Sequence, residues 1–369
     1  MNILGFNPSH HGSVCLLQDG EIKYFLQEDR LTRRKNDDLP FKVFIEILQN
    51  YRIDYIALGP PFSSYTHFFS KLATHFTPSS YNIKTYDYSF KNHHTTHAAH
   101  AFYNSGFKKS AVLVIDGIGS SIDKLGVETE SIFLFEYPSK IKLFYKRILN
   151  FDNIFSKKTK NYYISTNLSL ARSYRGITEI LGFKQNEEGK TMGLSSYGKL
   201  NSKIPNFFTL WDADPNIISH KKDNHSLNLN LKDYPNFNLK NKSYKWHYDE
   251  SKTTDLEKDI AWRIQNDTQK IVGNYVEKIV KETGYTKICC AGGYFLNCVS
   301  NYYLKKRFPN VEFYFEPIAN DAGTAIGAAK LLWHNLTQDN TIRPFKSLYL
   351  GPQYSKEKLL EGIKKYVGK

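Results

Sequence analysis

Cysteine and methionine are scarce in this chain of 369 residues, which has four of the first and two of the second. Cys289 and Cys290 are adjacent in an apolar stretch, while Cys15 and Cys298 lie near glycine turns. None has the spacing of a metal site or of a disulfide framework. This usage suits a reducing compartment, and we expect a cytoplasmic protein.

Long apolar runs are also missing. No stretch reaches the roughly 18 apolar residues that suggest a membrane helix, so the sequence predicts neither a membrane span nor a membrane partner. The first residues, MNILGFNPSHHGS, lack a basic segment followed by an apolar core, so export is not indicated. With 41% hydrophobic and 23% charged residues, the composition is that of a globular protein, long enough for one large two-lobed domain or two smaller ones.

Acidic residues are too few to balance the basic ones, and the net charge is +14 with a pI near 9.3. A surplus of this size favours a polyanionic partner such as nucleic acid. The alternative is a lysine- and asparagine-rich composition that reflects genome bias, and both explanations stay open. Aromatic residues make up 15% of the chain and can supply base-stacking surfaces, although most are expected in the core or on the surface.

The stretch NHHTTHAAHAF, from Asn92 to Phe102, carries the strongest chemical signal. His93 and His97 stand four apart in an alanine-rich run, so on a helix their side chains share one face and can bind one divalent metal. An apolar strand from Ala111 to Ile115 follows and delivers Asp116 at its end. The alternative is that these histidines only cap and line a helix.

An order of strand, Gly/Ser turn, strand and strand occurs twice, starting at residue 3 and again at residue 111. The turns fall at Ser9–Ser13 and Gly117–Ser121. This weak duplication predicts two related α/β lobes that face one another, with backbone N–H groups of both turns directed at phosphate. The alternative is that α/β proteins commonly begin with hairpins.

Further helices are expected at Phe41–Asn50, Leu168–Leu181 and Asp255–Glu282, and another from Tyr294 through YFLNCVSNYYLKK. Periodicity is lost between about residues 201 and 250. That region is either a surface insertion or a segment that binds a partner.

Three glycine-containing motifs complete the candidate site. In AGGYFLN, Gly292 and Gly293 allow close approach to a ligand and Asn297 can bond a ribose or a base edge. In NEEGKTMGLSSYG, Gly189, Gly193 and Gly198 surround Lys190, a cation on an expected flexible loop that suits phosphate. This motif lacks the Walker A spacing. A plain turn in the first motif and a capped helix end in the second are the alternatives.

The third motif, NDAGTAIGAA, places Asp321 at an expected helix N-cap. The carboxylate can also be a further metal ligand. With His93, His97 and Asp116 it would give two nitrogens and two carboxylates, a set that suits iron, zinc or manganese rather than calcium.

Together these motifs resemble the O-carbamoyltransferase family that acts in nodulation-factor and antibiotic decoration. The matching stretches are ILGFNPSHHGSVCLLQDGEI, QEDRLTRRK, NHHTTHAAHAFYNSGF, VLVIDGIG, GITEILGFKQNEEGKTMGLSSYG, ICCAGGYFLNCVSN and EPIANDAGTAIGAA. They occur in the family's order and cover most of residues 1–350 apart from 201–250.

The resemblance implies an α/β fold with the two-lobed actin/Hsp70-like ATPase architecture, built from duplicated RNase-H-like lobes and akin to the universal tRNA threonylcarbamoyl transferase. Lobe I would span residues 1–108 and lobe II residues 109–344, with an insertion at about 201–250. Residues 345–369 would be a C-terminal tail.

The resemblance also implies the site. Iron, or else zinc or manganese, would be held by His93, His97, Asp116 and Asp321. ATP or carbamoyl-adenylate would lie against Ser13, Lys190, Gly193, Gly292, Gly293 and Asn297. In the family, carbamoyl-adenylate made from carbamoyl phosphate and ATP passes its carbamoyl group to an acceptor hydroxyl. His10, in the first phosphate-facing turn, is our candidate for the base.

Two departures from the family pattern matter. The family usually has His-Asp-Ala-Ser where this chain has His10-His11-Gly12-Ser13, so His11 replaces a carboxylate and weakens the case for Mg²⁺, a further candidate cofactor, at this position. The family's second domain, which forms the adenylate, is absent from this sequence. We therefore expect a separate adenylate-forming subunit, or else a sequence that is part of a longer chain.

The acceptor is open at this stage. The basic, aromatic region at 201–250 and the net charge favour a nucleic-acid acceptor such as 5-hydroxymethylcytosine in DNA, which must be unstacked to be reached. A small-molecule or sugar hydroxyl is the alternative, and activity on tRNA adenosine is disfavoured. A non-catalytic nucleotide-binding subunit is the remaining reading.

Overall fold

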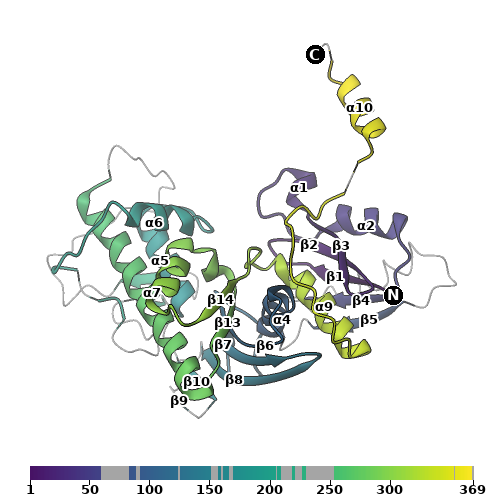
Figure 1. Cartoon of the computed structure of the whole chain (residues 1–369). Helices are drawn as coiled ribbons and strands as arrows, with labels where there is room; N and C mark the ends of the chain where they lie inside the picture. The colour runs from purple at the N-terminus through teal and green to yellow at the C-terminus, as the bar shows by residue number, and fades with distance from the viewer. Residues whose placement is uncertain are drawn as a thin grey trace.

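The computed structural model describes residues 1–59, 83–88, 92–123, 125–150, 157–158, 161–165, 169–204, 206–208, 218–220, 227–229, 253–352 and 354–367. Figure 1 shows two parts, with helices α4 and α9 between them. Most of the predicted insertion at 201–250 lies outside the described residues, and so does the basic and aromatic partner-binding segment expected there.

The first sheet has five strands in the order β3-β2-β1-β4-β5. Their bounds are Asn2–Asn7 for β1, Ser13–Gln18 for β2, Glu21–Gln27 for β3, Tyr55–Leu58 for β4 and Lys84–Asp87 for β5. Strands β1, β2 and β3 are antiparallel, whereas β4 pairs in parallel with β1 and β5 in parallel with β4. Apolar residues of the β1 and β2 strands are fully buried, so this sheet is the centre of its part of the core.

The second sheet repeats this arrangement. Its order is β14-β13-β6-β7-β8-β10-β9, with strands at Lys109–Ile115 (β6), Val127–Glu136 (β7), Lys140–Leu149 (β8), Lys157–Lys158 (β9), Tyr162–Ser165 (β10), Lys287–Ala291 (β13) and Glu312–Phe315 (β14). Strands β6, β7 and β8 are antiparallel, and β13 and β14 are parallel to β6 and to each other. The order β8-β7-β6-β13-β14 therefore matches β3-β2-β1-β4-β5. The duplicated two-lobed α/β fold predicted from the sequence is confirmed.

Two helices connect the lobes, because each follows one sheet in the sequence and packs on the other sheet. Helix α4 (His93–Ser105) follows the first sheet in sequence but packs on β6, β7 and β13 of the second. Helix α9 (Gly323–Thr337) follows the second sheet but packs on β1, β2 and β4 of the first. The two helices also pack on each other, and a Cβ at Gly327 would lie 2.0 Å from the carbonyl oxygen of Thr96. The predicted lobe boundary at residue 108 stays a prediction, but helix α9 packs with the earlier lobe.

Other helices cover the outer faces of the sheets (Figure 1). Helix α2 (Phe41–Asn50) packs on the first sheet, as predicted to the residue. Helices α5 (Leu170–Ile180) and α7 (Asp255–Thr283) pack with the core of the second. Thr254 and Glu257 form a capping box that fixes the start of α7. The described residues also include α1 (Asp29–Thr32), α6 (Glu188–Ser195), α8 (Cys298–Arg307), α10 (Lys356–Lys364) and the β11–β12 pair (Ile218–His220, Leu227–Leu229).

Three local expectations are corrected. The segment from Tyr294 is not one helix, because a 3₁₀ turn at Gly293–Leu296 (η3) precedes α8. Lys190 is not on a flexible loop, because Glu188–Ser195 is helical and buries Thr191, Leu194 and Ser195. Asp321 is not the N-cap of α9; Ala322 holds that position, and no side chain caps it.

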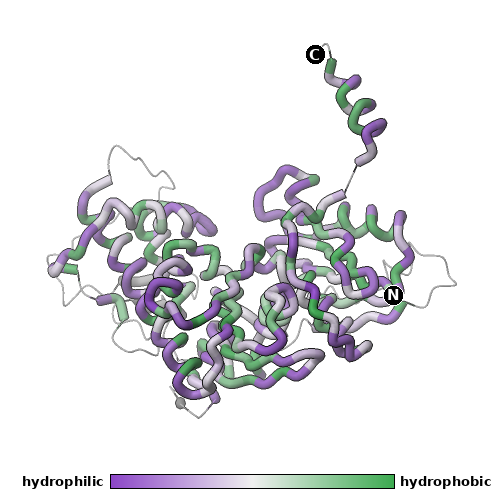
Figure 2. Tube along the Cα trace, viewed as in Figure 1, coloured by the Kyte–Doolittle hydropathy of each residue, from purple (hydrophilic) through white to green (hydrophobic). Residues whose placement is uncertain are grey.

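Helix α10 stands apart from the two lobes and buries none of its residues (Figure 1). Apolar and polar segments alternate along it in Figure 2. Within the described part of the chain, no helix is long and apolar enough to cross a bilayer.

Candidate metal centre and nucleotide cavity

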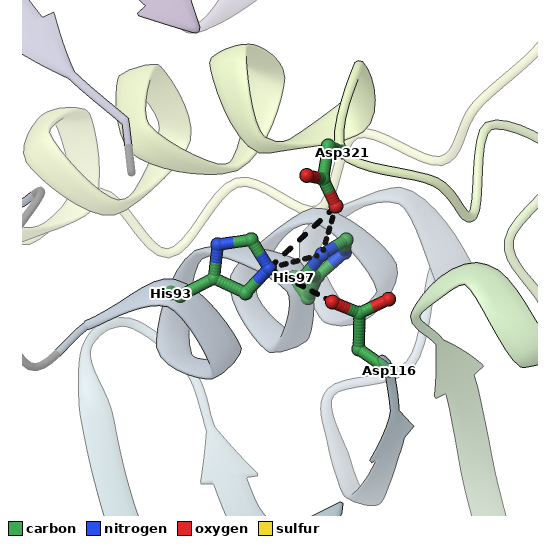
Figure 3. A group of neighbouring side chains, drawn as sticks. All are labelled: His93, His97, Asp116 and Asp321. Carbon is green, nitrogen blue, oxygen red and sulfur yellow. Dashed lines mark hydrogen bonds and ion pairs between the residues drawn. The ribbon is translucent and has the colours of Figure 1, made fainter. Parts of the chain in front are cut away.

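Four side chains from three separate segments meet at one point (Figure 3). The Nε2 atom of His93 lies 3.1 Å from Nε2 of His97, 3.2 Å from an Asp116 oxygen and 3.6 Å from an Asp321 oxygen. The same Asp321 oxygen is 3.4 Å from His97 Nε2. One ligand atom from each residue falls within a group no wider than 4.8 Å. The structure thus brings together the four residues that the sequence singled out.

Each ligand is positioned by the end of a regular element. His93 and His97 occupy the first turns of α4, one helical turn apart. Asp116 directly follows β6, and its backbone N–H donates to the carbonyl of Thr129 on the neighbouring strand. Asp321 directly precedes Ala322, the N-cap of α9. Because α4 and α9 pack together across the lobes, residues more than 200 positions apart share one site.

Hydrogen bonds orient the outer oxygens of both carboxylates. Asp116 Oδ1 accepts from the backbone N–H of Gly293 at 3.2 Å, which leaves Oδ2 facing His93. The hydroxyl of Ser9 donates to Asp321 Oδ2 at 3.4 Å, and His10 Nδ1 lies 3.6 Å from that oxygen. Asp321 therefore directs one oxygen at the histidines and the other at the β1–β2 turn. Such second contacts hold metal ligands in place in known metalloproteins.

The electrostatics of this cluster favour a cation. Burial opposes a charge on His93, yet the nearby Asp321 and Asp116 carboxylates raise its pKa to about 9. Burial likewise works against ionisation of Asp321, but His93 and His97 hold the pKa of this carboxyl well below its usual value. The two carboxylates thus stabilise positive charge between them, which a divalent cation would supply. Two imidazoles and two carboxylates fit iron, zinc or manganese.

A buried ion pair braces the start of α4. The Glu128 carboxylate on β7 accepts from the backbone N–H of His94 at 3.0 Å and from that of Ser120 at 3.2 Å, and it pairs with Lys146 on β8. The Ser120 hydroxyl accepts from the backbone N–H of His93 at 3.1 Å. Glu128 on β7 and Ser120 in the connection between β6 and β7 therefore satisfy the first donors of α4, and a carboxylate lies at its positive end. Nothing in the sequence pattern identified Glu128.

A cavity of about 840 Å³ opens above the cluster, and Asp116 and Asp321 form part of its wall. Residues from both lobes line it: His10, His11, Gln27, Asp29, Arg30, Arg33, Lys35, Asn36, Asn320 and Asp321 with Asp116, Gly117, Ile118, Ala171, Arg172, Tyr174, Arg175, Asn186, Glu188, Gly189, Met192, Gly293, Tyr294, Leu296 and Asn297. Its volume is in the usual range for sites of cofactor-sized ligands, roughly 300–1,000 Å³.

Residues 57–330, more than half of the chain, match the family described as "Carbamoyltransferase N-terminus". The chain belongs to this family. The family assigned from the ordered motifs is thereby confirmed.

Several curated proteins are similar to most of the chain. An uncharacterized protein of Synechocystis sp. is 28% identical over 414 residues, covering 97% of this chain and 62% of its own length. An uncharacterized protein of Methanocaldococcus jannaschii is 31% identical over 287 residues, covering 76% of this chain and 43% of the relative. Nodulation protein NolO of Bradyrhizobium diazoefficiens is 26% identical over 276 residues, with 73% and 43% covered. The chain therefore spans less than two thirds of each of these relatives.

Solved structures support the fold. Full-length HypF in its phosphate- and nucleotide-bound form aligns with a TM-score of 0.54 at 16% identity, covering 91% of this chain and 56% of HypF. HypF of T. kodakarensis also gives 0.54, at 10% identity, covering 93% of this chain and 49% of the other. At these identities the likeness concerns the fold alone.

The cavity contains some of the residues expected to bind nucleotide. Gly293 and Asn297 line it, as does His10, whose side chain is 57% exposed. Asn297 is already engaged, because its amide N–H donates to Gln265 at 2.8 Å and its carbonyl oxygen caps α8 through Ser300. Gly292 is not in the lining; it has φ +93°, and a Cβ at this position would lie 2.3 Å from the carbonyl oxygen of Ile115.

Other expected residues lie outside the lining. Lys190 is 53% exposed and pairs with Glu187 at 2.8 Å, while the exposed Gly193 is one turn from Gly189, which does line the cavity. The hydroxyl of Ser13 is buried and donates to the carbonyl of Ala322 at 2.7 Å. The binding roles of these three residues remain predictions. Their positions give no direct contact with the cavity.

The sequence reasoning gave no role to five cations in the lining. Arg30, Arg33 and Lys35 come from the segment after β3, and Arg172 and Arg175 from α5. Arginines three apart in a predicted helix share one face, which is the signal that was present for the last two. The first three lie in QEDRLTRRK, quoted above only for the resemblance.

Proposed function

We propose that this chain transfers a carbamoyl group from carbamoyl-adenylate to an acceptor hydroxyl, with the adenylate derived from ATP and carbamoyl phosphate. The observation that carries the proposal is the convergence of His93, His97, Asp116 and Asp321 at the wall of a cavity that both lobes line. Membership of the carbamoyltransferase family supports the reaction class.

The reaction needs a Lewis acid, an acceptor hydroxyl close to the carbamoyl carbon, and a base that takes the hydroxyl proton. A bound metal supplies a Lewis acid that polarises a carbamoyl or phosphate oxygen. The acceptor oxygen forms a bond to the carbamoyl carbon, the bond from that carbon to the AMP oxygen breaks, and the hydroxyl proton passes to a base. We assign the base to His10, which lines the cavity and lies beside Asp321. The products are the carbamate ester, AMP and a proton.

The nucleotide is assigned to the side of the cavity formed by α6, η3 and the start of α8. Gly189, Met192, Gly293, Leu296 and Asn297 line that side. Two of these are glycines, which let a flat base approach the backbone closely. The nucleotide-bound HypF structure, which has this fold, supports a nucleotide in this protein as well.

The metal is assigned as iron, with zinc or manganese as the alternatives that the same donor set suits. Mg²⁺ with the nucleotide is a further candidate, although His11 stands where the family usually has a carboxylate. Mg²⁺ prefers oxygen ligands, which an imidazole does not offer, so His11 is a poor replacement for that carboxylate. Burial and then the neighbouring His10 lower the pKa of His11.

For the acceptor we favour a hydroxymethylated nucleic-acid base such as 5-hydroxymethylcytosine in DNA. The net charge of +14 favours a polyanion, and a base carrying a hydroxymethyl group presents the required hydroxyl. A sugar or small-molecule hydroxyl is the second candidate. The resemblance to carbamoyltransferases of nodulation-factor and antibiotic decoration favours that class of acceptor.

A separate adenylate-forming subunit is the partner that we propose, in a cytoplasmic setting. The chain spans 43–62% of the length of the curated relatives named above, so each relative has residues that this chain does not match, and we propose that a partner supplies the adenylate-forming step. The competing class is a non-catalytic subunit that binds nucleotide and regulates a partner.

The test uses chain loaded with one divalent metal at a time and chemically synthesised carbamoyl-adenylate. A DNA oligonucleotide with one 5-hydroxymethylcytosine is the acceptor, and mass spectrometry reads the product. A gain of one carbamoyl group supports the proposal, whereas unmodified cytosine at the same position is the control that must stay unchanged. Nucleotide binding with no transfer to DNA, sugar or any other hydroxyl would leave the non-catalytic reading instead.

A further inference from the structure

Three cations that line the cavity have no ion-pair or hydrogen-bond partner for their side chains among the described residues. They are Arg33, Lys35 and Arg172. Of the other two, Arg30 contacts Asp29 at 3.3 Å and Arg175 contacts Glu179 at 3.3 Å. The unpartnered charges come from both lobes, since Arg33 and Lys35 follow β3 and Arg172 lies on α5 (Figure 1).

Among these three cations, Arg172 has the largest desolvation penalty in the absence of a counter-charge. It is half-buried, whereas Arg33 and Lys35 are exposed. Burial, and then the like charge of Arg175, lower the pKa of the Arg172 guanidinium. A cation kept partly out of water beside another cation is stabilised by an anion that enters the cavity.

The carboxylates in the lining do not supply this anion. Asp116 and Asp321 are engaged with the histidines, and Asp29 pairs with Arg30. Glu188 also lines the cavity, but burial raises its pKa and weakens its charge. Positive charge in the lining is therefore left over, which fits a ligand that brings its own negative charge.

We propose that Arg172, together with Arg33 and Lys35, binds a backbone phosphate of a nucleic-acid strand and so directs one of its bases to the metal centre. This rests on the proposed function and names the class of its acceptor. Guanidinium groups bind phosphate with two parallel hydrogen bonds, and neutralising one backbone phosphate releases counterions. Phosphate contacts of this kind fix the register of the strand, while the cavity is left to recognise the base.

The experiment measures binding of a fluorescein-labelled single-stranded oligonucleotide to the full chain by anisotropy across a series of NaCl concentrations. Arg172→Gln should weaken binding several-fold at low salt and reduce the slope of log K against log[salt] by about one unit. Arg172→Lys should keep most of the slope. Lys281→Gln is the matched control: Lys281 is exposed in the last turn of α7, lies outside the cavity, and should leave both quantities unchanged.

AMP binding to the same variants, measured by calorimetry, separates the two sources of phosphate. Unchanged AMP affinity in Arg172→Gln with weakened oligonucleotide binding supports the inference. Weakened AMP affinity with unchanged oligonucleotide binding overturns it, because the phosphate is then that of the nucleotide. An equal loss in Lys281→Gln also overturns it, since the effect is then general charge.

Carbamoyl transfer is measured in a separate assay from strand binding, so that failure of the proposed function and failure of this inference can be told apart. A chain that binds the strand through Arg172 but never transfers a carbamoyl group would contradict the proposed function and leave this inference standing. A chain that carbamoylates a sugar or small molecule, with strand binding indifferent to Arg172, would overturn this inference alone.

Discussion

The carboxylate of Glu128 accepts a hydrogen bond from the backbone N–H of His94 at 3.0 Å, although the two residues lie on different elements 34 positions apart. This contact fixes the first turn of α4, and therefore both imidazoles, against the second sheet that carries Asp116. The geometry of the metal centre thus depends on a carboxylate that does not enter it.

Replacement of Glu128 tests this dependence. Glu128→Gln should lower metal affinity by about tenfold, as loss of outer contacts does at known metal sites. It should also destabilise the fold by about 3–5 kcal/mol, because Lys146 is left buried without its counter-charge. Zinc titration by calorimetry and urea unfolding measure the two effects. Glu136→Gln on the same strand, where the carboxylate is exposed, should change neither.

Helix α6 offers a matched pair for the nucleotide side of the cavity. Gly189 and Gly193 are one turn apart, and a Cβ at either position meets nothing within 4 Å, but only Gly189 lines the cavity. Leucine at either position should stabilise the helix by about 0.5–1 kcal/mol, because glycine is a poor helix former. Gly189→Leu should also reduce AMP affinity severalfold, measured by calorimetry.

The partner substitution decides the role of Gly193. Gly193→Leu should leave AMP affinity at the wild-type value. An equal loss in both variants would show that the nucleotide reaches further along α6, as the sequence prediction for Gly193 and Lys190 implied.

A buried polar group at the contact between the lobes should make stability depend on pH. Glu316, at the end of β14, accepts from Asn104 of α4 at 3.1 Å, and Asn104 accepts from Lys330 of α9 at 2.7 Å. Tyr314 donates to Glu316, and His100 lies 3.4 Å away. Burial raises the pKa of Glu316 to about 7 from an ordinary 4.5.

The sign of the effect follows from the protons bound. Between pH 4.5 and 7 the folded protein keeps the Glu316 proton that the unfolded chain releases, so the free energy of unfolding falls as pH rises through this window. The free energy of unfolding falls by an amount on the order of a few kcal/mol across this window. Glu316→Gln should flatten this part of the curve, measured by urea unfolding at several pH values. A curve that keeps its full slope would exclude Glu316 as the source.

Substitutions on α4 can distinguish a metal ligand, His97, from the neighbouring His94, which is not a ligand. His97→Ala should lower metal affinity by at least about 100-fold, more than the loss of an outer contact, because a direct ligand is removed. His94→Asn is the control, since the His94 ring contacts Ser131 at 2.7 Å and does not enter the cluster. Metal content after dialysis, measured by plasma mass spectrometry, should fall for the first variant only.

Sequence reasoning succeeded where one local pattern determines the geometry. The spacing of His93 and His97 fixes a shared helical face, and an apolar strand places Asp116 at its end. The repeated strand order also followed from local patterns. Asp321 was placed at the site for its chemistry, but its expected capping role was wrong, because Ala322 is the N-cap of α9 and the Asp321 carboxylate contacts the two histidines and Ser9.

What the sequence could not provide are contacts that depend on tertiary packing. The glycines around Lys190 suggested a loop, yet burial of Thr191 and Leu194 keeps that segment helical. In the sequence Glu128 is one polar residue of a predicted strand. Its hydrogen bond to the His94 backbone forms only because α4 packs on the second sheet. The same packing determines which cations face the cavity.

The most direct test of the central claim is X-ray absorption spectroscopy of the full chain loaded with one equivalent of zinc. We expect a first shell of nitrogen and oxygen at about 2.0–2.2 Å with the outer scattering of two imidazoles, one of which is lost in His97→Ala. A shell of oxygen alone, or a spectrum that His97→Ala leaves unchanged, would contradict this claim.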